Sequence, residues 1–193
     1  MMQLQRCNKA GYTLIEVLVV VIIMGILSTM GAVGVQDAVA NSRVKGAAVN
    51  TAAFLERVGN LAKQRSEVIC VAVEPGNPQV LLAVKSKGTD CSNDNRIGGG
   101  VLARLLIDAP AQFVENKSGT CNFYGAADGV DLLGENAVFK SRIGLSSVPS
   151  GALCIQYGDD MRFGLAQKQS TSNAVKAFWR IGNDNGADSW SEL

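Results

Sequence analysis

A single carboxylate, Glu16, is the only formal charge between Lys9 and Asp37. It stands at the start of an apolar run whose centre, residues 17–27, reads VLVVVIIMGIL. A charged side chain within a membrane span costs a few kcal/mol, less near the interface, so it is by default a functional residue. The alternative is that Glu16 only reaches to the membrane surface and has no specific partner.

The cysteines are the second group of residues that could form specific bonds. The chain has five: Cys7, Cys70, Cys91, Cys121 and Cys154. No CxxC pair occurs, which argues against a zinc ribbon or a thioredoxin-type site. The last four predict two disulfides in an oxidising compartment, pairing neighbours along the chain as Cys70–Cys91 and Cys121–Cys154. Other connectivities and free buried thiols stay open at this stage.

Histidine is absent from all 193 residues. This excludes Ser-His-Asp and Cys-His nucleophiles, His-ligated zinc and an imidazole switch. We therefore expect no enzyme, no cofactor and no metal site. The loop at residues 183–188 could offer oxygens to calcium, but it does not match an EF-hand loop, and solvated turn acids are the simpler interpretation.

The charge balance is close to neutral, with 18 Lys and Arg against 17 Asp and Glu and a net charge of +1. Such a balance argues against a protein-wide field for nucleic acid. A local basic patch could still hold DNA, an option that we do not favour; it would consist of Lys63, Arg65, Lys85 and Lys87.

The apolar run is long enough to cross a membrane. From Tyr12 to Val35 it has 24 residues, which at about 1.5 Å per residue spans the ~30 Å hydrocarbon core. Arg6 and Lys9 precede it without an acid, which predicts a cytoplasmic N-terminus and an extracytoplasmic remainder. A cleaved secretory signal peptide and a generic signal anchor are alternatives, but neither accounts for Glu16.

Residues 9–16 read KAGYTLIE and lead directly into the apolar run. This segment resembles the processing signature of type IV pilins and type II secretion pseudopilins: a basic leader ending in Gly, an aromatic residue, Thr, Leu, an aliphatic residue and Glu. Gly11 and residues 12–16 match position by position, with Tyr12 in place of the commoner Phe. A weaker resemblance, over residues 41–44, 61–65 and 68–70, is to minor pilins and H-type minor pseudopilins.

The resemblance implies a structural subunit. A prepilin peptidase would cut between Gly11 and Tyr12, where glycine offers an unhindered backbone, and the new Tyr12 amine would be N-methylated. Glu16 would attract the Tyr12 amine of a neighbouring subunit during assembly. The implied partners are other subunits through the N-terminal helix, the peptidase, the inner-membrane assembly platform and inner-membrane lipid. The implied location is the bacterial inner membrane, and then a pilus or pseudopilus fibre.

Two other roles within this class stay open: a major pilin, and a DNA-uptake or adhesive tip pilin that acts as a binding module. Loss of the leader removes Arg6 and Lys9, which leaves 16 basic against 17 acidic residues and a net charge of −1. The four cysteines of the mature chain, its large loops and its size favour a minor subunit.

The elements that position these residues follow from periodicity. Side chains suited to one buried helix face recur at three- and four-residue steps beyond the span, which predicts one helix from about Tyr12 to about Arg65. All are apolar except Thr51; they are Val44, Ala48, Thr51, Leu55, Val58 and Ala62. Glycines 25, 31 and 34 weaken this helix or serve close helix packing.

Strand patterns follow the helix, at residues 68–73, 80–85, 101–107, 113–115, 121–124, 137–143, 152–157, 162–167 and 174–181. The last is predicted to be half-buried, with Lys176, Phe178 and Arg180 outward, and residues 182–193 read as a polar tail. We therefore predict an α+β fold whose helix covers one face of an antiparallel sheet. The predicted divisions are a leader at 1–11, a helix at 12–66 with its transmembrane part at 12–35, and a β-rich extracytoplasmic domain at 67–193.

Overall fold

The computed structural model describes residues 12–89, 91–92, 100–114, 130–131, 138–140, 144–145, 151–159, 161–168, 174–182 and 190–193. The chain divides into two compact units, residues 1–39 and residues 40–193. The predicted strand at 121–124 lies outside the described residues.

One helix, α1 (Leu14–Arg65), accounts for the whole predicted helical segment. In the second unit its buried face is the one predicted from periodicity: Val44, Ala48, Thr51, Leu55, Val58 and Ala62 have no exposed surface. The one hydroxyl on this face is satisfied within the helix, because Thr51 Oγ1 donates to the carbonyl oxygen of Ala47 at 2.7 Å. The helix prediction is therefore confirmed in extent and in orientation.

Among the described residues, the strands form two sheets. The first has the order β3-β2-β1-β6-β7 and is antiparallel throughout. Its members are β1 (Ile69–Glu74), β2 (Asn77–Lys85), β3 (Val101–Leu106), β6 (Val138–Lys140) and β7 (Gly144–Leu145). The turn between β1 and β2 is tight, and Gly76 has a φ of 79° there, a conformation that glycine adopts at no steric cost.

The second sheet has the order β11-β10-β9-β8-β4, and β5 pairs in parallel with β8. Its members are β4 (Ala111–Val114), β5 (Val130–Asp131), β8 (Gly151–Tyr157), β9 (Arg162–Lys168), β10 (Val175–Ile181) and β11 (Ser191–Glu192). The strand predictions at 152–157, 162–167 and 174–181 correspond closely to β8, β9 and β10.

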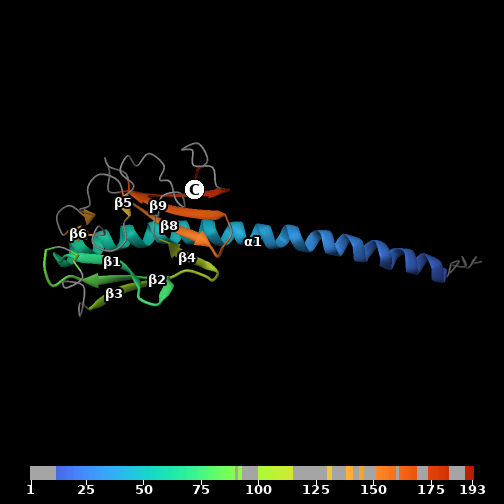
Figure 1. Cartoon of the computed structure of the whole chain (residues 1–193), viewed down its shortest axis with the longest axis horizontal. Coiled ribbons are helices and arrows are strands. Elements are labelled where there is room, and N and C mark those ends of the chain that lie inside the picture. The colour runs from blue at the N-terminus through green and yellow to red at the C-terminus, as the bar shows by residue number, and fades with distance from the viewer. Residues whose placement is uncertain are drawn as a thin grey trace, which may run out of the picture. The chain divides into compact units, whose positions relative to one another are not determined.

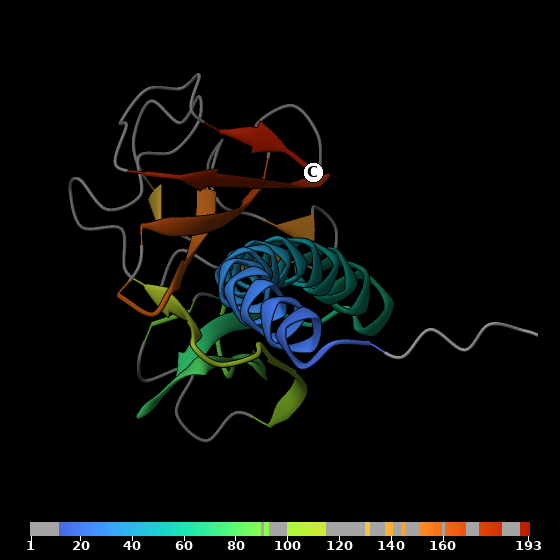
Figure 2. The same cartoon turned by 90° about the vertical axis from the view of Figure 1, so that its right-hand side faces the viewer.

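The second half of α1 lies between the two sheets, with β1–β3 on one side and β8–β10 on the other (Figures 1 and 2). A single apolar core joins helix residues such as Leu55 and Val58 to Val71 and Leu81 of the first sheet and to Ile155 of the second. The α+β class is confirmed, but the prediction of one sheet face against the helix was wrong. The helix also buries Phe54, so its apolar stripe is wide enough to serve two sheets.

The prediction that β10 is half-buried was also wrong. Phe178 and Arg180, expected to face solvent, are only 4% and 2% exposed, whereas Ile181 is 54% exposed. The outer face of the second sheet has a small apolar cluster of its own that includes Phe178 and Trp190. The Arg180 guanidinium lies 5.0 Å from the ring centre of Phe163 and 4.8 Å from that of Trp190, which favours its burial through cation–π attraction.

Residues 182–193 were expected to be a polar tail, and this too requires correction. Ser191 and Glu192 form β11 opposite Trp179 and Phe178 of β10, and the Leu193 N–H donates to the carbonyl oxygen of Ala177 at 2.9 Å. Trp190 anchors the segment because it is only 7% exposed. One tryptophan among polar neighbours was the signal that residues 190–193 pack against the sheet.

Gly164 on β9 lies close against α1. A Cβ atom there would lie 3.1 Å from the Val44 carbonyl oxygen and 3.2 Å from the Ala48 Cβ. Gly164→Val is therefore expected to lower the free energy of unfolding by about 1–3 kcal/mol through overpacking. Denaturant unfolding, monitored by tryptophan fluorescence, measures this change in the free energy of unfolding.

The matched control is Gly46→Ala on α1, where an added Cβ would meet no atom within 4 Å. Because alanine has a higher helix propensity than glycine, this change should raise the free energy of unfolding by up to about 1 kcal/mol. Equal stability of Gly164→Val and the wild-type chain would contradict the close-packed contact.

Candidate functional site

The first turn of α1 is held by Thr13. Its Oγ1 accepts a hydrogen bond from the Glu16 N–H at 3.3 Å, and its carbonyl oxygen accepts from the N–H groups of Glu16 and Val17 at 3.1 and 3.3 Å. Thr13 is therefore the N-cap, since it satisfies amide groups that have no partner within the helix. Thr at the cap with Glu three residues later is the pattern of a capping box, a signal present in the sequence but not used in the prediction.

Glu16 lies in this first turn and is exposed. The position suits a carboxylate, because the helix dipole places partial positive charge at the N-terminus. Among the described residues, the Glu16 carboxylate accepts no hydrogen bond and makes no ion pair. The side chain on which the sequence analysis centred is therefore available to a group from outside the chain.

The segment that follows is apolar on all sides. Large side chains from Leu14 to Leu27 are between 45% and 84% exposed, so this part of α1 is not the core helix of a soluble domain. By length and composition it is able to cross a membrane. Its hydroxyls suit that environment, because Ser28 Oγ donates to the Met24 carbonyl oxygen and Thr29 Oγ1 to that of Ile26, both at 2.7 Å.

The structure describes one of the two residues that are predicted to flank the cleaved bond. Gly11 lies outside the described residues, and Tyr12 precedes the cap with 83% of its surface exposed. Tyr12, Thr13 and Glu16 thus occupy one short stretch in which the backbone enters the helix.

One of the two predicted disulfides can be checked among the described residues. Cys70 of β1 and Cys91 form a disulfide with an S–S distance of 2.02 Å, and both residues are buried. This is one of the two pairs expected from the sequence. Cys154 on β8 is also disulfide-bonded, while its expected partner, Cys121, lies outside the described residues.

The structure adds little support for the two remaining candidate sites, the basic patch for DNA and a metal site. In the proposed basic patch, Lys85 Nζ is paired with Glu67 Oε1 at 2.6 Å, and Lys63 and Arg65 lie in the last turn of α1. Within the described ranges, no group of three or more His, Cys, Asp or Glu side chains could hold a metal ion. Residues 183–188, named as a calcium option, fall outside these ranges.

The cap predicts a measurable effect at Thr13. Thr13→Val removes the hydroxyl at nearly constant volume and is expected to destabilise the first turn by about 1 kcal/mol. Amide hydrogen exchange of Glu16 and Val17, whose N–H groups donate to Thr13, should therefore become about fivefold faster in detergent micelles. Thr13→Ser keeps the hydroxyl and should exchange at the wild-type rate; unchanged exchange in the valine variant would show that Thr13 does not act as the cap.

Comparison with known proteins bears on this same segment. Residues 6–32 match a family model described as the prokaryotic N-terminal methylation motif. The match includes Gly11, Thr13 and Glu16 and reaches far into the apolar run. Comparisons with curated proteins and with solved structures gave no match. The chain therefore carries the N-terminal signature of type IV pilins and pseudopilins.

Proposed function

We propose that the protein is a minor structural subunit of a type IV pilus or of a type II secretion pseudopilus. Proteins with this N-terminal signature are structural rather than enzymatic, and the signature implies contact with other pilin subunits and with a prepilin peptidase. The observation that carries the proposal is the position of Glu16 at the exposed, capped start of an apolar helix. Cleavage after Gly11 would leave the Tyr12 amine one residue before that cap.

A charge argument supports pairing between subunits. A new ammonium at Tyr12 is disfavoured by its own helix, because the N-terminal end of α1 already carries partial positive charge. A carboxylate from a neighbouring chain would offset that charge, and Glu16 is unengaged among the described residues. In a low-dielectric surrounding such a pair is strongly distance-dependent, so it would fix the register of adjacent helices.

A packing argument supports assembly over a free monomer. The side chains from Leu14 to Leu27 present apolar surface on every side of the helix. Burial of such surface is favourable by roughly 25 cal/mol per Å², which lipid can supply before assembly and neighbouring helices after it. The minor role is supported by the sequence features already named, the cysteines and large loops in a chain of 193 residues.

The test is the mass of the protein recovered from its native cells. Intact-protein and peptide mass spectrometry should find a chain that begins at Tyr12 and carries one methyl group on its amine. The same protein should be enriched in sheared fibres or cross-linked to other subunits. A chain that keeps residues 1–11, or one cut elsewhere in the apolar run, would overturn the proposal.

A further inference from the structure

A surface pocket of the second unit lies between α1 and the segment in which β3 ends, and its volume is about 290 Å³. The helix contributes Arg43, Gly46 and Asn50, which follow one another at three- and four-residue steps and therefore share one helix face. The opposite wall includes Leu106 and Asp108. These five residues define what we call the Gly46 pocket, and all of them belong to the second unit.

Gly46 leaves open space on the helix side of the pocket. An added Cβ atom at this position would meet no atom within 4 Å, whereas at Gly59, further along the same helix, it would lie 3.5 Å from the Phe139 ring. Glycine inside a helix is destabilising relative to alanine. Because no atom of the chain takes up the space at Gly46, the pocket has room for a side chain from outside the molecule.

The pocket carries two opposite charges that are not paired with each other. Among the described residues, the Arg43 guanidinium makes one hydrogen bond, from Nη1 to the Ala109 carbonyl oxygen at 2.9 Å, and the Asp108 carboxylate accepts none. On the neighbouring strand β3, by contrast, Arg104 Nη2 pairs with Glu74 Oε2 at 2.6 Å. Both pocket charges are therefore available to charges of opposite sign on another molecule.

A large apolar side chain projects beside this open space. Leu106 is 64% exposed although leucine gains free energy when it leaves water. The patch thus combines a projecting leucine with a hollow, and a cation with an anion. A surface that holds both members of each matching pair is complementary to a second copy of itself, related by a twofold axis, because each contact then occurs twice.

We propose that two copies of this chain bind face to face through the Gly46 pocket. Leu106 of each copy enters the space over Gly46 in the other copy, and Arg43 of each pairs with Asp108 in the other. A second copy is favoured over a different protein because this one patch supplies every complementary group. The contact is separate from the helix-mediated assembly proposed above.

Cross-linking of the full chain in lipid vesicles tests the proposal. Asn50→Cys places a thiol on the pocket wall, in a Cys7→Ser background and without reductant so that the Cys70–Cys91 bridge remains. A short bismaleimide should then join two chains into a dimer that is visible on a denaturing gel. The dimer fraction is counted above that of the same chain without the added cysteine, and the absence of any such excess would overturn the proposal.

Exchange of the charges shows whether the contact joins two copies. Arg43→Asp and Asp108→Arg should each lower the cross-linked fraction by about fivefold or more, because each variant places like charges opposite each other in both halves of the contact. An equal mixture of the two variants should return to the wild-type fraction, since the acids of one chain then face the arginines of the other.

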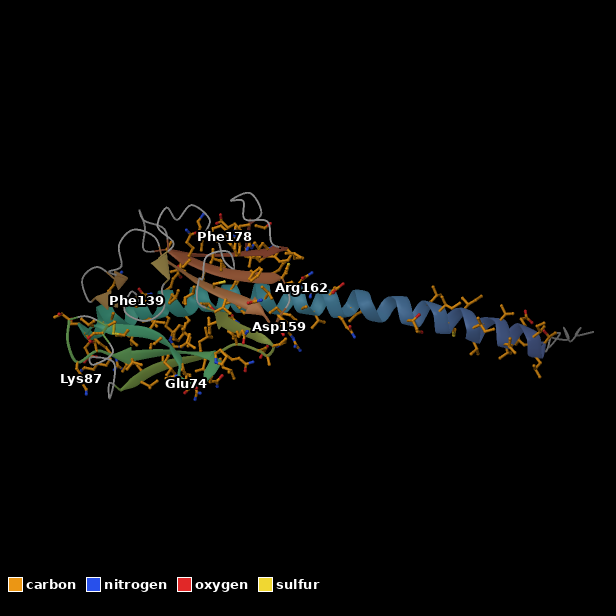
Figure 3. All side chains as sticks on the ribbon, in the orientation of Figure 1. Glu74, Lys87, Phe139, Asp159, Arg162 and Phe178 are labelled. Carbon is orange, nitrogen blue, oxygen red and sulfur yellow. A yellow bond between two sulfur atoms is a disulfide. The ribbon has the colours of Figure 1, made fainter. Side chains whose placement is uncertain are left out.

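Lys87→Asp is the matched control, because it makes the same change of charge at an exposed cation distant from the pocket. Figure 3 shows Lys87 and Asp159 at opposite ends of the β domain. Asp159 is at the end nearer the pocket, since the adjacent Gly158 N–H donates to the Pro110 carbonyl oxygen at 2.9 Å, two residues beyond Asp108. The control variant should cross-link as the wild-type chain does.

Gly46→Leu tests the hollow without removing any contact within the chain. Leucine favours the helix more than glycine does and would fill the open space, so the chain should fold while its cross-linked fraction falls severalfold. Wild-type cross-linking by Gly46→Leu or by the two charge variants would overturn the proposal. A mixture of the charge variants that stays as low as each alone would assign the pocket to a different ligand and would also overturn it.

Discussion

A chain carrying Glu16→Gln is expected to be inserted and cleaved normally but to reach fibres at less than about a tenth of the wild-type level. Glutamine keeps the size of the side chain and one acceptor oxygen, while it removes the charge and replaces the other oxygen by an NH2 donor. An uncompensated ammonium among packed apolar helices costs more than the 1.4 kcal/mol that corresponds to a tenfold change. Immunoblots of whole cells measure insertion and cleavage, and immunoblots of the sheared fibre fraction measure incorporation into fibres.

The control for this variant is Glu16→Asp, which keeps the charge on a side chain shorter by one methylene. It should retain a larger share of fibre incorporation than the glutamine variant. Normal incorporation of Glu16→Gln would contradict the pairing with the Tyr12 amine. Retention of this variant at precursor size would instead assign Glu16 to leader removal.

A chain carrying Gly11→Val is expected to keep its leader entirely. A β-branched residue before the cleaved bond crowds the backbone that a membrane peptidase must approach, whereas glycine leaves it open. The protein should migrate at precursor size and be missing from fibres, because the Tyr12 amine is never formed. Ala10→Val is the matched control one position earlier and should be processed; a mature-sized Gly11→Val band would refute the assigned bond.

Periodic features of the sequence were sufficient to predict α1. The six residues from Val44 to Ala62 were predicted as one buried face, and all six have no exposed surface. Helix periodicity is a local property, so residues three and four apart report burial without knowledge of the rest of the fold. The strands β8, β9 and β10 were found for a similar reason.

Features that depend on distant segments were predicted less well. Arg180 reads as a solvent-facing residue in its own strand, and its burial depends on Trp190, which lies ten residues further along the chain. The packing of a second sheet against α1 was not predicted, because an apolar stripe in the sequence shows that one helix face is buried but not how many sheets cover it. The Thr13 cap has a local signal, Thr followed by Glu at the third position, but the sequence analysis did not use it.

The placement of α1 between two sheets has a mechanical consequence. Tension along a helix that lay on one face of a domain could peel it away contact by contact. Here Leu55 and Val58 are enclosed by both sheets, and Glu56 and Lys45 bridge to β10. A pull along the helix axis would therefore load these contacts in shear and at the same time, and not one after another.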